Sequence, residues 1–521
     1  MKRVSFLQHA REHHEGGLPK YVEQELRRYL KCGILAHGFL RAYCESCGRS
    51  VLVAFSCKRR GVCPSCNARR MSGTAAHLVD HVIPDVPLRQ WVLSVPFELR
   101  LTLARHAHAL TAVGRIFVEE VFRWQRERAR ELGTSEVRSG AVQFPQRFGG
   151  SLNLNVHYHV AIPDGVFTRT EPGGRADFVP LPRPTQSDLE DLALNVEIRV
   201  MRWLRRRRLV MDSDEVDYGN ACPDRDALDA CLEGSLGLGE LTCLPDAHGS
   251  RSDDGVEAPT GSDRPTRRSA RYRGFDVHAG VVTTATDREG KERLLRYCAR
   301  PPLSLARLSV TAEGLVAYRL RKPWDSSRTH RMMSPLQFLA RLAALVPPPR
   351  HPLIRFHGAF APHSAWRSSV VPVPVQSRDA QADDTLAERS PNDERTGPDG
   401  EGQCSGSRGV ASPSGDGSVV LQPVAAELST TDSKSTGKKF HAAPRAITAG
   451  SGYIDWAELL KRVYDVDALA CPCGGRLRFI ALITDQETAQ TILEAMALPA
   501  EPPPVARARS PDFVDEIPPD W

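Results

Sequence analysis

The chain has 521 residues, which is room for two to four domains, and its 69 Lys and Arg against 63 Asp and Glu leave a formal net charge of +6. No apolar run reaches the roughly 18 residues of a membrane span, and no apolar segment at the N-terminus resembles a signal peptide. We therefore expect neither secretion nor membrane insertion.

The N-terminal region combines a predicted helix, residues 8–29, with a local excess of positive charge. Between Arg27 and Arg70 there are ten Lys or Arg and one acidic residue, Glu45. A solvated basic face is the common explanation for such a block. The near absence of acids favours contact with phosphate instead.

Six cysteines in this region have the spacing of metal ligands. Cys44-x2-Cys47 and Cys63-x2-Cys66 are separated by 15 residues, close to the pattern of a four-cysteine zinc site. Paired spacing indicates metal thiolates in a reducing cytosol rather than disulfides. Four thiolates complete the tetrahedral coordination of Zn²⁺, so we expect a structural site.

Cys32, His37 and Cys57 remain as spare ligands, which either form part of a second site or replace one of the four. The surface of such a zinc module would carry basic side chains, and basic side chains bind the DNA backbone. The candidates for DNA binding here are Lys58, Arg59, Arg60, Arg69 and Arg70.

The next segment predicts a strand at 89–95, a long amphipathic helix at 101–132 and a hairpin of 140–144 with 151–162. Polar and apolar residues alternate along the second hairpin strand. Because successive side chains of a strand point to opposite faces, His157 and His159 stand side by side, close enough to bind one divalent cation. The alternative is an amphipathic edge strand with its polar face in water, since a single His-x-His motif is weak evidence.

A second candidate site lies on a later helix. After a helix that begins at the capping-box pattern Ser187-x-x-Glu190 and a flexible insertion at about 246–269, a strand at 275–285 and a helix at 287–299 are expected. The helix carries Tyr297 and ends before prolines. Three basic side chains near Tyr297 would attract phosphate: Arg293, Arg296 and Arg300. The alternative is a half-buried tyrosine on an amphipathic helix.

The C-terminal part divides into three stretches. A hairpin is expected at 308–319 and a capped helix after Ser334, followed by an Arg-, His- and aromatic-rich segment, 351–367, that suits base stacking or core packing equally. Residues 368–439 contain no aromatic side chain and predict a disordered linker. Beyond it, Cys471 and Cys473 offer only two ligands, so we expect a structural turn, with a helix, a strand and a helix around it.

Taken together, these motifs resemble the rolling-circle transposases of the HUH (His-hydrophobic-His) endonuclease superfamily. The resemblance is closest to the insertion-sequence class with an N-terminal zinc-binding domain, of the type found with insertion-sequence common regions. The motifs that carry it are Phe55-Ser56-Cys57-Lys58-Arg59-Arg60-Gly61 with Cys63-Pro64-Ser65-Cys66, Asn155-Val156-His157-Tyr158-His159, Arg296-Tyr297 before Arg300-Pro301-Pro302, and Arg355-Phe356-His357-Gly358-Ala359-Phe360-Ala361-Pro362.

The resemblance implies an α+β protein in four parts. These are a Cys-rich zinc- and DNA-binding module (1–80), a catalytic antiparallel sheet with helices on one face (81–372), the disordered linker (373–448) and a small C-terminal α/β segment (449–521). It also implies a location in the bacterial cytoplasm, with the nucleoid.

The implied activity is that of a metal-dependent tyrosine endonuclease and strand transferase. His157 and His159 would hold Mg²⁺ or Mn²⁺, with His278 as candidate third ligand, and Tyr297 would form a 5′-phosphotyrosine. The partners would be single-stranded DNA at the element ends and target DNA, with the host replication machinery left open. Some relatives carry a second tyrosine four residues earlier, but here Arg293 occupies that position.

Two other functions remain open from the sequence. A rolling-circle replication initiator or relaxase would share the same nuclease core. A non-catalytic zinc-dependent DNA-binding protein would need neither the histidine pair nor Tyr297 for its function.

Overall fold

The computed structural model describes residues 6–169, 171, 174–210, 226–237, 268–320, 329–372 and 456–501. Nearly all of the insertion predicted at 246–269 and the whole linker predicted at 373–448 lie outside these residues. None of the described helices is both long and apolar enough to cross a lipid bilayer.

The largest sheet has six strands in the order β14-β5-β6-β3-β10-β9, and every neighbouring pair is antiparallel. The predicted α+β class and the predicted 140–162 hairpin are therefore confirmed. The strand bounds are β3 Leu88–Ser94, β5 Gly140–Phe148, β6 Leu154–Pro163, β9 Ser269–Tyr272, β10 Phe275–Thr283 and β14 Arg355–Gly358.

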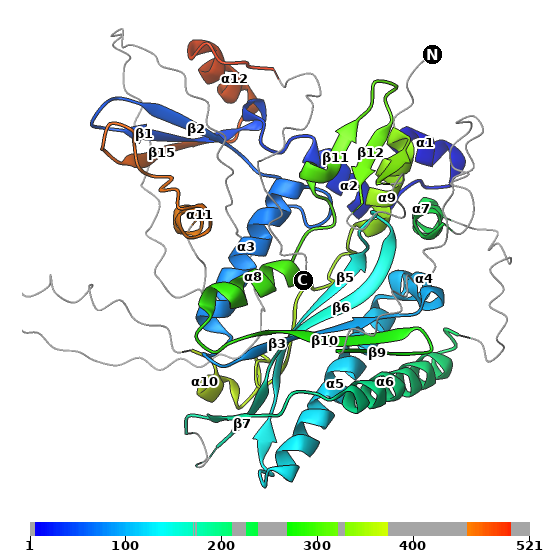
Figure 1. Cartoon of the computed structure of the whole chain (residues 1–521). Helices are drawn as coiled ribbons and strands as arrows, with labels where there is room; N and C mark the ends of the chain where they lie inside the picture. The colour runs from blue at the N-terminus through cyan, green and yellow to red at the C-terminus, as the bar shows by residue number, and fades with distance from the viewer. Residues whose placement is uncertain are drawn as a thin grey trace, which may run out of the picture.

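Two long helices, α5 (Ala107–Glu131) and α6 (Gln186–Arg206), pack on one face of this sheet (Figure 1). The apolar side chains of β6 point towards them, as the alternation predicted, and the Tyr158 hydroxyl donates to the Leu110 carbonyl at 2.8 Å. The helix approaches this closely because Gly114 has no side chain. A Cβ there would lie 2.8 Å from the Tyr158 ring.

The other face, which carries the histidine pair, is covered by α3 (Pro64–His81) and α8 (Arg288–Cys298) (Figure 1). Their apolar residues form a second core with Phe144 of β5 and Ala161 of β6. The prediction of helices on one face only is therefore wrong. This face of the sheet carries its own apolar side chains, including Val142, Phe144 and Ala161, so it too is covered by helices.

Three helix boundaries differ from those expected. The segment 8–29 forms two helices, α1 (Phe6–His13) and α2 (Lys20–Tyr29), because Gly16 and Gly17 between them have positive φ. The segment 101–132 is likewise divided at His106 into α4 (Phe97–Arg105) and α5. Helix α6 begins at a capping box of Thr185 and Asp188, two residues before the one predicted.

A separate three-stranded sheet joins the two ends of the chain. Its order is β15-β1-β2, so the C-terminal strand β15 (Leu477–Ile483) pairs with β1 (Phe39–Cys44), which also pairs with β2 (Ser50–Ala54). Helix α12 (Gln486–Ala495) packs on the short helix η1 (Leu35–His37), and α11 (Trp456–Tyr464) packs on α3. The C-terminal elements were predicted, but their union with the N-terminal module was not.

Of the remaining elements, α7 and α9 pack with α1 and α2 in a further core, whereas β4, β7 and β8 form a small sheet beside the C-terminal part of α5. Helix α9 begins at the predicted Ser334 capping box with Pro335 in its first turn. The further bounds are α7 Ala227–Leu236, α9 Pro335–Leu345, α10 Arg367–Val370, η2 Leu305–Arg307, β4 Val137–Arg138, β7 Gly165–Thr168, β8 Asp177–Pro180, β11 Leu308–Val310, β12 Val316–Arg319 and β13 His330–Met333.

Candidate active site and metal centres

The histidine pair lies in the middle of the six-stranded sheet. His157 and His159 project from β6 towards α8, and their ring centroids are 4.9 Å apart. Strands β5 and β3 flank β6, and the two side chains are 7% and 3% exposed. The alternative of an edge strand with polar residues in water is therefore wrong.

Burial keeps both imidazoles neutral. It lowers the pKa of His157 to about 4 and the pKa of His159 well below its ordinary value, in the latter case with help from the neighbouring His157. A neutral ring has a lone pair for a cation. Nε2 of His159 is buried and has no hydrogen-bond partner in the part of the chain that the structure describes, so the pair fits a divalent metal ion.

Helix α8 brings Tyr297 to this pair. The helix begins at Asp287, whose side chain accepts from the Gly290 backbone N–H at 2.8 Å. In its last turn the Tyr297 ring lies edge-on to His159, with centroids 5.4 Å apart. The Arg300 guanidinium lies 4.8 Å from the centre of the Tyr297 ring. Two distant segments of the sequence, the histidine pair of β6 and the end of α8, thus meet at one place.

His278 is not gathered into this group. It lies on β10, where it pairs with Val92 of β3, and Val92 in turn pairs with His159. Two strand spacings, about 10 Å, separate the backbones of His278 and His159. The groups of potential metal ligands among the described residues do not include His278 with the pair.

Two buried glutamines beside the pair were missed from the sequence. The Gln90 amide nitrogen lies 2.9 Å from Nδ1 of His159 and 3.3 Å from the Cys298 sulfur. Gln146 pairs directly with His157 across β5 and β6, and its Oε1 is buried without a hydrogen-bond partner among the described residues. Only the strand register shows that these residues share the face of the histidines, so no sequence motif points to them.

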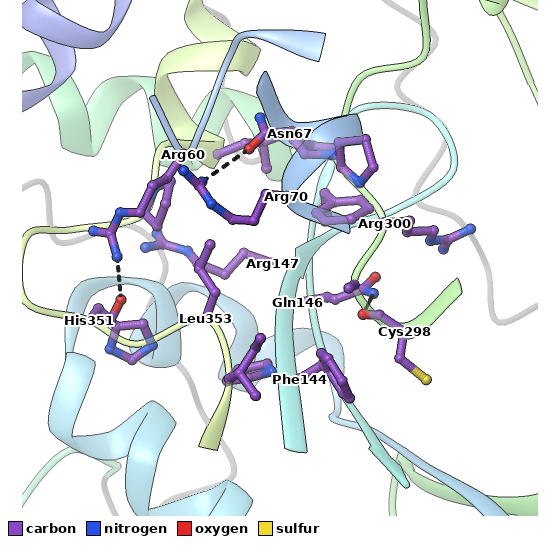
Figure 2. Close-up of a pocket in the computed structure, with 18 of the residues that line it drawn as sticks. Arg60, Asn67, Arg70, Phe144, Gln146, Arg147, Cys298, Arg300, His351 and Leu353 are labelled. Carbon is purple, nitrogen blue, oxygen red and sulfur yellow. Dashed lines mark hydrogen bonds between the residues drawn. The ribbon is translucent and has the colours of Figure 1, made fainter. Parts of the chain in front are cut away.

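A basic pocket adjoins the end of α8. Figure 2 shows arginines from four separate segments around it, and the Gln146 amide donates to the Cys298 carbonyl at 2.7 Å in its wall. Its basic residues are Arg60, Arg70, Arg147 and Arg300. Arg147 on β5 was not predicted to be part of any site.

The predicted DNA-binding arginines differ in what they contact. Arg60 donates to the backbone carbonyls of His351 at 2.9 Å and Pro348 at 3.1 Å, so it also joins the zinc module to the segment after α9 (Figure 2). Arg70 contacts Asn67 and backbone carbonyls of its own module. Lys58 and Arg293 are exposed, whereas the others are partly exposed: Arg59, Arg69 and Arg296.

The aromatic side chains of 351–367 divide between the two roles that the sequence left open. Phe360 is fully buried and packs against Phe167, with ring centroids 6.2 Å apart. Phe356 is partly buried and has the Arg367 guanidinium 5.8 Å from its ring centre. Phe360 therefore belongs to the core.

The cysteines form two groups of four, and the pairing differs from the prediction. Cys63 and Cys66 join the former spare residues Cys32 and Cys57. Cys44 and Cys47 join two cysteines from the other end of the chain, Cys471 and Cys473. The prediction of one site from Cys44, Cys47, Cys63 and Cys66 is wrong, because β1 and β2 carry the first knuckle away from α3. Cys471 and Cys473, which were expected to form only a structural turn, thus belong to a group of four potential metal ligands.

The sulfur positions of the first group fit zinc. The Sγ atoms of Cys32 and Cys66 are 3.7 Å apart, those of Cys57 and Cys66 3.5 Å, and those of Cys63 and Cys32 3.5 Å. Zn–S bonds of about 2.3 Å at tetrahedral angles place sulfurs about 3.8 Å apart. All four thiols are free of disulfides, so this group supports a structural Zn²⁺.

Fold and site together define a zinc-binding α+β protein in which a buried histidine pair faces a tyrosine. A family model described as "Transposase zinc-binding domain" matches residues 5–95, and one described as "Putative transposase" matches residues 140–368, from β5 to α10. No curated protein and no solved structure matches the chain. The chain is an insertion-sequence transposase with an N-terminal zinc-binding domain, and so a DNA-processing enzyme.

Proposed function

We propose that this transposase nicks and rejoins single-stranded DNA through a 5′-phosphotyrosine at Tyr297, as the step that drives rolling-circle transposition. One observation carries the proposal. The Tyr297 ring, on a helix more than a hundred residues further along the chain, lies 5.4 Å from the ring of buried His159. A purely structural tyrosine has no need of two neutral, closely spaced imidazoles beside it.

His157 and His159 would hold Mg²⁺ or Mn²⁺. When bound, the ion polarises the scissile phosphate and balances the charge that develops on it. Binding of an ion through Nε2 of His159 requires the ring proton to be on Nδ1. The Gln90 side-chain oxygen accepts a hydrogen bond from that N–H when the amide is turned so that its oxygen faces the ring. Imidazole favours softer cations, so Mn²⁺ should support activity at least as well as Mg²⁺.

Gln146 is better placed than His278 as a third ligand. It stands directly across from His157, and its buried Oε1 has no partner among the described residues. An amide oxygen is a ligand that Mg²⁺ and Mn²⁺ accept. His278 would serve only if β10 moved towards β6.

The chain's own groups account for both halves of the reaction. The Tyr297 phenol loses its proton as its oxygen attacks phosphorus, the bond from phosphorus to the 3′ oxygen breaks, and the leaving 3′ oxygen takes up one proton, so the net reaction neither gains nor loses a proton. The phosphotyrosine conserves the energy of the broken bond. A 3′-OH of target DNA then attacks the same phosphorus and releases the phenol. Arg300, beside the ring, would contact the phosphate oxygens in both steps.

The basic pocket would receive the strand next to the cleaved phosphate. It lies between α3 of the zinc module and the end of α8, and four arginines line it. Unpaired strands are bound through such charge together with base stacking, for which Phe148 in the same pocket is available. End recognition would then fall to the zinc module, in the bacterial nucleoid where such DNA resides.

Covalent capture tests the proposal. Protein and Mn²⁺ are mixed with labelled single-stranded DNA from the ends of the element and run on a denaturing gel. A protein–DNA band should form, and Tyr297→Phe and His157→Ala should each abolish it while DNA binding persists. Tyr272→Phe, at an exposed tyrosine on β9, serves as the matched control and should leave the band unchanged.

Either of two results would contradict the proposal. One is the absence of any band from protein that still binds authentic ends, which would leave a DNA-binding zinc protein. The other is a band that survives Tyr297→Phe, which would assign the nucleophile to another residue. Transfer of the captured strand to added target DNA would further separate a transposase from a replication initiator.

A further inference from the structure

We propose that Cys44, Cys47, Cys471 and Cys473 bind a second zinc ion that ties the C-terminal segment, residues 456–501, to the N-terminal module. Two of these four ligands lie far outside the residues 5–95 that match the zinc-binding family. The site is therefore split between the two ends of the chain. It does not depend on the nuclease chemistry proposed above.

The four sulfurs are placed as ligands of one ion. Sγ of Cys44 lies 3.6 Å from Sγ of Cys473, and Sγ of Cys47 lies 3.6 Å from Sγ of Cys471. A disulfide would require about 2.05 Å, whereas the edge of a zinc–thiolate tetrahedron is about 3.8 Å. Ligand atoms of all four residues lie within 4.8 Å of one another.

The backbone forms two similar knuckles around the sulfurs. In the first, the Cys44 N–H donates to the Arg49 carbonyl at 2.9 Å, and Gly48 has a positive φ. In the second, the Cys471 N–H donates to the Gly475 carbonyl at 2.9 Å, and Gly474 has a positive φ. Tight turns of this kind let both cysteines of a pair face the same ion.

The approach of the two knuckles depends on Gly475. A Cβ at this position would lie 2.9 Å from the Cys44 sulfur and 2.6 Å from the Ser46 hydroxyl. A larger residue would therefore separate the thiol pairs. Glycine at this position is explained by the split site, since a plain surface turn would accept many side chains.

Strand β15 needs such an anchor because it buries little. Of its seven residues five are exposed, including Phe479, Ile480 and Leu482, and only Ile483 is buried. The paired cysteines are 424 and 429 residues apart in sequence, so joining them carries a large loop-closure entropy. A zinc ion beside the β1–β15 ladder offsets that cost where apolar burial does not.

The tied segment reaches the helix that carries Tyr297. On α11, Leu459 packs against α3 at Gly73, and Arg462 donates to Asp80 of α3 at 2.6 Å and to Glu292 of α8 at 2.7 Å. The zinc clamp would therefore hold α11 across both helices. The two ends of the chain and the tyrosine helix become one connected unit.

Zinc content of the purified full-length protein tests the site. Elemental analysis should give two zinc ions per chain for the natural sequence and one for Cys471→Ser/Cys473→Ser. Cys231→Ala, which removes a buried cysteine of α7 outside both groups, should keep two. Cys473→His, which retains a zinc ligand, should also keep two. One zinc in the natural protein, or two in the serine variant, would overturn the proposal.

A cut between the two ends tests the tie itself. A protease site is introduced between residues 373 and 455, the full chain is cleaved, and the products are separated by gel filtration. The C-terminal fragment should co-elute with the rest of the natural protein and of the Cys473→His variant. It should elute separately from Cys471→Ser/Cys473→Ser. Co-elution that persists in the serine variant would overturn the tying role.

Discussion

Two regions of this transposase present metal ligands, and the chain assembles them in opposite ways. His157 and His159 come from one strand, two residues apart, and the strand period alone puts them on the same face. Cys44 and Cys473 are 429 residues apart and meet only because β1 pairs with β15. The first arrangement costs no loop closure and is fixed early, whereas the second requires nearly the whole chain to fold.

The two kinds of site also differ in the role that a bound metal ion would have. The histidine pair supplies two ligands and leaves coordination positions for a phosphate, which catalysis requires. Each cysteine group offers four thiols, which as thiolates would close the coordination sphere of one ion. A closed site stabilises structure only. The comparison therefore predicts that losses at the cysteines appear in folding and that losses at the histidines appear in metal binding.

The largest effect is expected from Cys63→Ser/Cys66→Ser. These residues open α3, and α3 packs on α8 and on the second core, so loss of this zinc removes the support of the whole histidine face. Structural zinc contributes about 10–16 kcal/mol of apparent binding free energy in small zinc domains. We expect little soluble folded protein, measured by expression yield and circular dichroism.

The matched variant is Cys471→Ser/Cys473→Ser. It should leave the six-stranded sheet folded, since the second cysteine group lies outside that sheet and its core. Equal loss of folded protein in both variants would contradict the distinction between a local and a split zinc site.

The same distinction explains which parts of the structure the sequence predicted. Alternation along β6 and helical spacing along α5 depend on neighbours in sequence, so the hairpin, the histidine face and the Tyr297 helix were all predicted correctly. The grouping of Cys44 with Cys471 depends on the register of β1 and β15. Cysteine spacing instead favoured the nearer partners, Cys63 and Cys66, which is why that prediction failed.

The active-site residues differ in the same way, between those predictable from local sequence and those that only strand pairing brings to the site. Tyr297 was predicted from its own helix and from the family resemblance, and the structure places it beside His159. Gln90 and Gln146 were missed because a glutamine in a strand carries no motif, and only pairing with His157 and its neighbours gives it a role. His278 was the third ligand that the family resemblance implied, and β3 lies between its strand β10 and the histidine strand β6.

A smaller effect, confined to metal binding, is expected from Gln90→Leu. The Gln90 amide contacts Nδ1 of His159 and fixes the orientation of the ring. Loss of a side chain that orients a ligand weakens metal affinity by about 10–100-fold. Titration of Mn²⁺ followed by electron paramagnetic resonance would measure the change.

Gln143→Leu is the control for this variant. Gln143 is another buried glutamine of the same sheet, and it donates to the Gly114 carbonyl on the opposite face. The control should lose similar stability and keep its Mn²⁺ affinity. Equal affinities for the two variants would show that Gln90 does not orient the metal ligand.

A change of about 1–2 kcal/mol in the free energy of unfolding is expected from Arg462→Ala. The change removes the cation that Asp80 and Glu292, 19% and 10% exposed, share. Asp80 keeps its ion pair with Arg288, so the cost falls mainly on Glu292. Thermal unfolding and hydrogen exchange along α8 and α11 would measure it. Arg478→Ala is the control, because the Arg478–Glu45 pair is 71% and 66% exposed and should contribute almost nothing. Equal effects would contradict the bridging role of α11.

The smallest effect concerns pH. The Mn²⁺ affinity of the buried histidine pair should not change near pH 6.5, where the affinity of an exposed pair would fall. Burial lowers the pKa of His157 from 6.5 in the unfolded chain to about 4. The imidazole therefore stays neutral in the folded protein as pH falls from 6.5 towards 4, while the unfolded chain takes up the proton, so stability declines across this window and levels off below about 4. Mn²⁺ affinity should instead hold until pH approaches 4, since the cation competes with protons for a lone pair of the folded site. Affinity measured across this range that halves near pH 6.5 would show that water reaches the rings, and the buried site inferred from β6 would then be wrong.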